Sequence, residues 1–294
     1  MRDVSLNSPV GEGSVRVTAR RCWRALRVLM HLLGGVLEAI WLRAGRDPHR
    51  VVILNAKRRW CLRFLTILGV ELRVQGPLRA GPVLLVSNHV SWLDIPVIAA
   101  ARPCYFLSKA EVAEWPVIGW LARAVGTLFI RRGGGESKAK TEEIRGRLDR
   151  GHGILVFPEG TTTDGTGVRR FFPQLFAAAG DDAPVQTVAV RYRDEQGRPD
   201  TGIAFIDDDE FHHHLWRLLG RRRIVVELTF GAPLPPDEPR ALAREARERI
   251  VADLGAAVGY RPSICPNPTV RPGSRKVPLS PTRRVVSCLP PTAS

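Results

Sequence analysis

The chain has 294 residues, 44% of them hydrophobic, which is enough to bury the core of one large domain or two small ones and excludes a mini-protein. Lysine and arginine number 44 against 29 aspartates and glutamates, and the formal net charge of +15 indicates an anionic partner, either nucleic acid or a membrane surface. Five widely separated cysteines without a C-x-x-C pair favour neither a disulfide framework nor a zinc site.

The distribution of charge favours a lipid surface over nucleic acid. Residues 1–76 carry 14 basic and 5 acidic side chains among long apolar stretches, and residues 261–294 carry 6 basic and no acidic ones. A segment that is both basic and apolar is typical of binding to a bilayer. The sequence has no zinc-finger spacing, aromatic platform or basic recognition helix, so we expect no nucleic-acid partner.

The N-terminal region is expected to contain an unstructured segment followed by a helical hairpin. Residues 1–20 are polar and lack the apolar core of a secretory signal. Residues 22–42 and 51–68 are apolar with interspersed charges, so we predict two helices within residues 21–69. They either associate with a membrane, lying on or dipping into the bilayer, or pack as ordinary amphipathic helices on a soluble core.

Short apolar runs bounded by turn residues predict strands, and longer segments between several of them predict helices. We expect strands near 69–74, 83–86, 104–108, 126–130, 153–157, 184–190 and 223–230, and helices near 95–101, 112–125, 137–150, 171–179 and 239–254. This order predicts an α/β domain over residues 70–258, with a mixed, mostly parallel central sheet flanked by helices. Residues 261–294 are rich in Pro, Ser and Arg and are expected to form a disordered basic tail.

A polar cluster follows the buried strand at 83–86 and contains His89, with Asp94 five residues later. Loops at the carboxyl ends of strands are where α/β proteins gather their chemistry. A carboxylate on one imidazole nitrogen fixes the tautomer and leaves the other nitrogen free to take a proton from an alcohol. The spacing Ser91-x-x-Asp94 equally fits a capping box, in which case His89 has no chemical task.

Two further predicted strands also end in polar groups. The strand near 126–130 ends in Arg131 and Arg132, which suit an anionic head group or form a solvated basic loop. The strand near 153–157 runs into Glu159, Gly160 and Thr161, and backbone N–H groups of such a turn can hold an oxyanion.

An acidic run at residues 207–210 and a histidine run at 212–214 look like metal ligands at first sight. Consecutive histidines cannot easily converge on one ion with a fixed second shell. We therefore expect a solvated helix start here and no metal site.

Together these motifs resemble the glycerolipid acyltransferase family typified by 1-acyl-glycerol-3-phosphate acyltransferase. The resemblance covers roughly residues 70–230 and rests on four motifs: Asn88-His89-x-x-x-x-Asp94, Gly126-Thr127-x-Phe129-Ile130-x-Arg132, Phe157-Pro158-Glu159-Gly160-Thr161 and Pro184-Val185. It implies an O-acyltransferase that moves a fatty acyl group from acyl-CoA or acyl carrier protein to the free hydroxyl of a lysolipid. It also implies a place at the cytoplasmic face of the cell membrane.

The resemblance assigns roles to these residues. His89 is the general base, Asp94 orients and charges it, and the acceptor head group lies against Arg131 or Arg132, Glu159, Gly160 and Thr161. A thioester is already activated, so a base worth about 10²–10⁴-fold and the positioning of two substrates suffice without a cofactor, metal or covalent nucleophile.

The chain departs from the family pattern at the acceptor motifs. The family usually has an arginine after Glu-Gly-Thr and then Phe-Lys-x-Gly, where this chain has Thr162 and Phe172-Pro173-Gln174-Leu175, and the second proline of the last motif is Thr187. We take 1-acyl-glycerol-3-phosphate as the expected acceptor and lyso-ornithine lipid, a zwitterionic aminolipid, as the alternative. A membrane-bound scaffold without turnover is a third hypothesis, which the intact pair of His89 and Asp94 argues against.

Overall fold

The computed structural model describes residues 13–131, 137–206 and 209–255, and the structural statements below concern these residues. Four expectations lie outside them: residues 1–12 of the unstructured N-terminal segment, the basic tail at 261–294, Arg132, and residues 207–208 of the acidic run.

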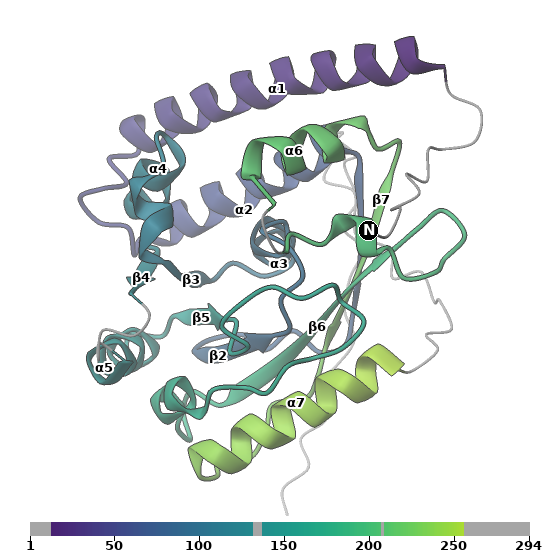
Figure 1. The fold of residues 1–294 in the computed structure, drawn as a ribbon. Coiled ribbons are helices and arrows are strands. Elements are labelled where there is room, and N and C mark those ends of the chain that lie inside the picture. Colours follow the sequence, from purple (N-terminus) through teal and green to yellow (C-terminus); the bar gives the residue numbers. More distant parts are fainter. Residues whose placement is uncertain (1–12, 132–136, 207–208, 256–294) are drawn as a thin grey trace, which may run out of the picture. The chain divides into compact units, whose positions relative to one another are not determined.

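Seven strands within the described residues form one sheet in the order β1-β7-β6-β2-β5-β3-β4 (Figure 1). The strands are β1 (Val70–Gln75), β2 (Val83–Ser87), β3 (Tyr105–Lys109), β4 (Leu128–Ile130), β5 (Gly153–Val156), β6 (Val185–Arg193) and β7 (Ile224–Phe230). Neighbouring strands are parallel except for β6 and β7, which pair antiparallel. The predicted mixed, mostly parallel sheet is therefore confirmed.

Helices cover both faces of the sheet (Figure 1). One face packs against α2 (Val51–Leu68), α3 (Asp94–Ala101) and α6 (Phe211–Gly220), and the other against α5 (Ser137–Leu148) and α7 (Pro239–Gly255). In β2, Val83 and Leu85 belong to the first core, whereas Leu84 and Val86 belong to the second. Because β2 is buried on both faces, it reads in the sequence as one continuous apolar run.

The shorter elements lie in the connections between strands. They are the 3₁₀ helices η1 (Ala110–Glu114), η2 (Pro173–Ala178) and η3 (Thr201–Ile203), and the helix α4 (Ile118–Ala124). The sequence predicts that the helical segment at 112–125 is broken by Pro116 and Gly119, and the structure has two pieces there, since Pro116 lacks a backbone N–H and interrupts the helical ladder. The segment at 171–179 is helical as predicted, but in the tighter 3₁₀ form.

The first helix, α1 (Ser14–Trp41), begins earlier than expected. The prediction of an unstructured segment over residues 1–20 is wrong from residue 14 onward. The Arg20 Nε donates to the Gly220 carbonyl at 3.1 Å, and the Arg24 Nη1 donates to the Arg221 carbonyl at 2.5 Å. The last carbonyls of a helix have no partner of their own, so these arginines satisfy the end of α6 and hold α1 in place. Because the contacting residues Arg20 and Gly220 are 200 positions apart, no local pattern in the polar N-terminal segment predicts this contact.

The C-terminal half of α1 packs against α2. The imidazole of His31 in α1 stacks on the Trp60 indole of α2 with 4.5 Å between ring centroids, and Glu38 pairs with Arg59 at 3.2 Å. The second helix ends at Gly69, whose φ of +75° is a left-handed conformation that glycine adopts without strain. None of the helices in the described part of the chain is both long and apolar enough to cross a bilayer.

Candidate active site

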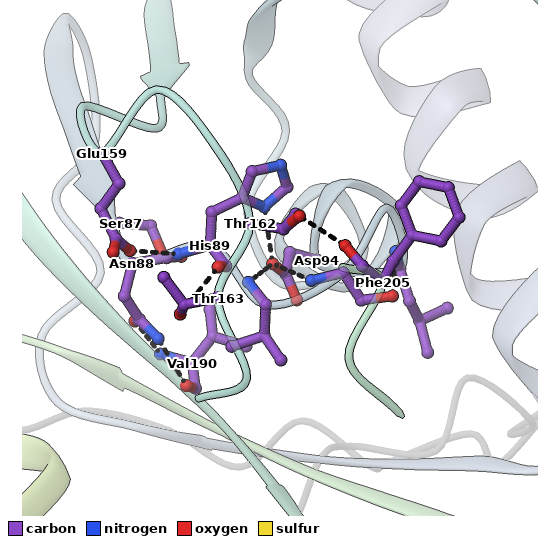
Figure 2. A network of polar contacts seen from close by, with 12 residues as sticks. Ser87, Asn88, His89, Asp94, Glu159, Thr162, Thr163, Val190 and Phe205 are labelled. Carbon is purple, nitrogen blue, oxygen red and sulfur yellow. Dashed lines mark hydrogen bonds and ion pairs between the residues drawn. The ribbon is translucent and has the colours of Figure 1, made fainter. Parts of the chain in front are cut away.

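The site lies at the carboxyl end of β2, where the chain leaves the buried sheet (Figure 2). Asn88 anchors this point to the neighbouring strand, because its Nδ2 donates to the Val190 carbonyl at 3.0 Å and its Oδ1 accepts from the Val190 N–H at 2.8 Å. The amide thus continues the ladder between β2 and β6 for one more residue. His89 follows immediately and is held at the edge of the sheet.

The imidazole of His89 and the carboxylate of Asp94 are directly hydrogen-bonded (Figure 2). The His89 Nδ1 lies 2.8 Å from the Asp94 Oδ2, which also accepts the N–H groups of Val90 at 2.8 Å and Ser91 at 3.0 Å. Asp94 is fully buried in the first turn of α3. The carboxylate therefore reaches back to the backbone of Ser91, as a capping box requires, and holds the histidine at the same time. The same oxygen thus makes the backbone contact of a capping box and the contact with His89, so a helix-capping role for Asp94 leaves the pairing with His89 intact.

The contacts of Asp94 fix which ring nitrogen of His89 carries hydrogen. Since the carboxylate acts as an acceptor, Nδ1 is the donor and Nε2 holds the lone pair. The Nε2 atom has no hydrogen-bond partner among the described residues. The ring stacks on Phe157 with 3.8 Å between centroids, so its plane is fixed as well. An oriented imidazole with a free lone pair is suited to take a proton.

Glu159 follows β5 and supports His89 through the backbone. Its Oε1 accepts the His89 N–H at 2.8 Å (Figure 2). Its Oε2 accepts the Arg169 N–H, also at 2.8 Å. The side chain is 3% exposed, and burial raises the pKa of the carboxyl group while the hydrogen bonds oppose that rise. With both oxygens engaged and almost no exposure, Glu159 joins the two loops rather than facing an open cleft.

The turn after Glu159 forms one wall of an open cleft of about 610 Å³. Gly160 turns the chain with a φ of +73°, and a Cβ there would lie 3.1 Å from the Phe172 ring. The Thr163 N–H donates to the His89 carbonyl at 2.8 Å, so the cleft wall is joined to the proposed base. The cleft is lined by Thr161, Thr162, Thr163, Asp164, Thr166, Gly167, Val168, Arg169 and Ile206.

Arg131, which the motifs also assigned to the acceptor site, is not part of this cleft. Arg131 follows β4 and is exposed. The cleft residues follow β5, and the sheet order places β3 between β4 and β5, a separation of two strand spacings, or about 10 Å. Arg131 does not line the cleft, and Arg132 lies outside the described residues.

Two residues of the histidine run, His212 and His213, are exposed, and the third, His214, is buried. Glu210, His212 and His213 place three potential ligand atoms within 4.8 Å of one another, but all three side chains are exposed. His214 instead points inward and is fully buried, accepting a hydrogen bond from the Trp92 indole at 3.0 Å. The expectation of a solvated helix start without a metal site therefore stays a prediction.

Sequence reasoning missed three residues that the fold brings to the site. The Tyr192 hydroxyl donates to the Asp94 Oδ1 at 2.6 Å, from β6. Arg169 lines the cleft, and Asn88 anchors the loop. In the sequence, Tyr192 has the pattern of an ordinary strand residue and Asn88 that of an ordinary loop residue. Their partners, Asp94 and Val190, lie about a hundred positions away, and no sequence pattern predicts either contact. Only the position of Asn88 directly before His89 indicated that it belongs to the site.

Comparisons with known proteins show which family the chain resembles and which fold it shares. An acyltransferase family model matches residues 70–191. A lyso-ornithine lipid O-acyltransferase from Pseudomonas aeruginosa is 44% identical over 234 residues, covering 77% of this chain and 90% of that protein. A 1-acyl-sn-glycerol-3-phosphate acyltransferase from Neisseria gonorrhoeae is 34% identical over 168 residues, covering 55% and 64%. The crystal structure of a 1-acyl-sn-glycerophosphate acyltransferase from Thermotoga maritima aligns with a TM-score of 0.56 at 21% identity, covering 82% and 98%.

Proposed function

The chain belongs to the acyltransferase family, and from this premise we propose that it moves a fatty acyl group from a thioester to the free hydroxyl of a lyso-ornithine-type lipid. The observation that carries the proposal is the oriented His89, whose Nδ1 is bonded to Asp94 and whose Nε2 has no hydrogen-bond partner among the described residues. The backbone carbonyl of His89 accepts the N–H of Thr163, which lines the cleft. The donor is acyl-CoA or acyl carrier protein, as the resemblance implies.

The proposed reaction needs one base and two bound substrates. The His89 Nε2 removes the proton of the acceptor hydroxyl while the oxygen attacks the thioester carbonyl carbon. The C–O bond forms, the C–S bond breaks, and the imidazolium returns its proton to the leaving thiolate. Asp94 stabilises the imidazolium between these steps, and Glu159 acts as a positioning residue through the backbone N–H of His89.

Two observations favour the aminolipid acceptor over 1-acyl-glycerol-3-phosphate, which the sequence alone put first. The similarity to a lyso-ornithine lipid O-acyltransferase is higher and covers more of both chains than the similarity to the glycerophosphate enzyme. The cleft also lacks the arginine that the family usually carries after Glu-Gly-Thr, since Thr162 stands there and its hydroxyl donates to the Phe205 carbonyl (Figure 2).

The charges on the cleft support the same acceptor. Arg169 and Asp164 both line it, and no ion pair joins them within the described part of the chain. Hydrogen bonds from Thr166 lower the pKa of Asp164, so this side chain is negative at neutral pH. A guanidinium and a carboxylate on one cleft match the carboxylate and ammonium groups of a zwitterionic head group, whereas Asp164 would repel a phosphate.

The same proposal places the protein at the cytoplasmic face of a membrane, where its acceptor resides. The apolar residues Trp23, Leu26, Met30, Leu33, Leu37 and Trp41 recur every three or four positions along α1, and each is about half exposed or more. This stripe and the basic surplus of the N-terminal region suit contact with the head groups and acyl chains of an anionic leaflet.

The test is acyl transfer from labelled acyl-CoA and acyl carrier protein to a panel of lysolipids, with purified protein in detergent. We expect transfer to lyso-ornithine lipid and a loss of at least about 10²-fold in His89→Ala. The exposed His212→Ala serves as the matched control and should behave as wild type. Transfer only to the phosphate-bearing lysolipid would restore the acceptor expected from sequence. Failure of the wild type to acylate any lysolipid would favour a non-catalytic scaffold.

A further inference from the structure

We propose that Tyr192 is a positioning residue of acyl transfer, whose phenol shares the charge of the Asp94 carboxylate and thereby sets the base strength of His89. This inference rests on the proposed roles of His89 and Asp94. It adds a third side chain, contributed by β6 at a position outside the recognised motifs.

The position of Tyr192 follows from the register of β6. Alternate residues of a strand share one face, and Val188, Val190 and Tyr192 all belong to the core that lies between the sheet and α3. Val190 is held by the Asn88 amide, so the register of β6 is fixed directly beside the site loop. Two residues further on, the phenol reaches the Asp94 Oδ1 at 2.6 Å.

The carboxylate of Asp94 uses its two oxygens differently. Oδ2 accepts from the His89 ring and from two backbone N–H groups, whereas Oδ1 accepts from Tyr192. Both side chains are buried, and an O–H···O⁻ bond of this length between buried groups is of the strong, charge-assisted kind. Burial and the neighbouring charge of Asp94 raise the pKa of Tyr192 well above its usual value, so the phenol stays a donor.

A donor on Oδ1 withdraws charge from the oxygen that faces His89. The imidazolium that forms during proton transfer is then held less tightly, and it can return the proton to the thiolate more readily. Without the phenol, the carboxylate is more basic and retains the imidazolium to higher pH. Tyr192→Phe should therefore shift the pH dependence of the reaction in one direction, which simple loss of packing would not do.

The chain offers a matched control for the loss of a buried phenol. Tyr105 is also buried, and its hydroxyl donates a single hydrogen bond of 3.0 Å, to the Pro48 carbonyl. Tyr105→Phe removes the same atom and leaves one acceptor without its donor, but the acceptor is not part of the pair of His89 and Asp94. Comparing the two variants separates a general cost to the fold from an effect on the base.

The experiment measures kcat/KM against pH, and the titration of His89 by ¹⁵N NMR, for the wild type and both variants. In Tyr192→Phe we expect kcat/KM to fall by roughly 10- to 100-fold at neutral pH. We also expect the acidic limb and the NMR midpoint to move up by about 0.5 pH unit. Tyr105→Phe should leave both pH values unchanged. The NMR titration needs no substrate, so it tests Tyr192 even if the proposed acceptor is wrong.

A midpoint in Tyr192→Phe equal to that of the wild type, with a loss of kcat/KM no larger than in Tyr105→Phe, would overturn the proposal. If Tyr192→Phe does not fold, 3-fluorotyrosine is incorporated into the Tyr105→Phe protein, which retains Tyr192 and Tyr260. Fluorine makes the phenol a stronger donor, so the midpoint should then move to lower pH. An unchanged or higher midpoint in the fluorinated protein would equally overturn it.

Discussion

The Trp92 indole Nε1 donates a hydrogen bond of 3.0 Å to the Nδ1 of His214, although 122 positions separate the two residues. Because Nδ1 is the acceptor, the ring hydrogen is on Nε2, which faces the carbonyls of Ile203 at 3.2 Å and Ala204 at 3.0 Å. The histidine thereby joins α6 to the loop that carries the site. Burial lowers the pKa of His214, so the folded protein holds this ring neutral.

This arrangement predicts a loss of stability on mild acidification. A lowered pKa in the folded state means that the unfolded chain binds a proton first, so the stabilisation is present above about pH 6.5 and is lost as pH falls below it. We expect the unfolding free energy to fall between pH 7.5 and 5.5, and to fall less in His214→Gln.

Chemical denaturation at the two pH values measures this difference. His212→Gln removes an exposed histidine from the same helix and should retain the pH dependence of the wild type. The prediction fails if His214→Gln and the wild type lose the same free energy on acidification.

The centre of the sheet was predictable because β2 and β5 are fully buried and stand out in the sequence as apolar runs between turns. The parallel arrangement also made the site predictable, since His89 and Glu159 follow β2 and β5, which are neighbours in the sheet. What the sequence did not reveal depends on contacts between distant segments. The beginning of α1 is held by arginines that bind the end of α6, and no local signal in residues 14–20 reports this contact.

The same limit applies within the site. Asp94 could be placed because it lies five residues from His89, whereas Tyr192 reads as an ordinary aromatic residue of a strand. The motifs also placed Glu159 in the acceptor site, but its buried oxygens bind two backbone N–H groups. The sequence therefore identified Glu159 as a residue of the site, and only the structure shows which groups its carboxylate contacts.

Asp94→Asn should reduce kcat/KM by about 10²–10⁴-fold while the protein stays folded. An amide lacks the charge that stabilises the imidazolium, and its NH₂ group replaces one of the acceptor oxygens that now bind His89 and Tyr192. Initial rates at saturating thioester give the loss. Asp149→Asn, at an exposed position, is the control and should retain full activity. Activity within threefold of the wild type in Asp94→Asn would show that the pair is only a helix cap.

Glu159→Gln should destabilise the protein by about 1–3 kcal/mol, because the amide NH₂ faces a backbone N–H that needs an acceptor. We also expect a lower kcat, since the His89 N–H is one of the two donors concerned. Urea denaturation and steady-state kinetics measure the two effects. Glu142→Gln, on the exposed side of α5, should change neither. A large rise in KM with unchanged stability would instead indicate that Glu159 contacts the acceptor directly.

The charges on the cleft should decide which head group is accepted. Arg169→Gln and Asp164→Asn are each expected to raise the KM for lyso-ornithine lipid about tenfold, since each removes one charged partner of the zwitterion. The neighbouring Arg170→Gln, exposed but not in the cleft lining, should leave KM unchanged. An equal rise in all three variants would mean that only the general positive charge of this surface matters.

The apolar stripe on α1 should determine binding to anionic vesicles. Replacing Leu26, Leu33 and Leu37 together by Ser removes side chains that are 50%, 49% and 67% exposed, so the fold loses little packing. Their transfer into the acyl region is favourable by an amount that scales with their area, so we expect vesicle affinity to fall at least about tenfold. Co-sedimentation with phosphatidylglycerol vesicles measures the affinity, and Val251→Ser, an exposed apolar residue on α7, provides the control. If the triple variant binds vesicles as the wild type does, the two N-terminal helices serve only to cover the sheet, and the membrane contact has to be sought elsewhere.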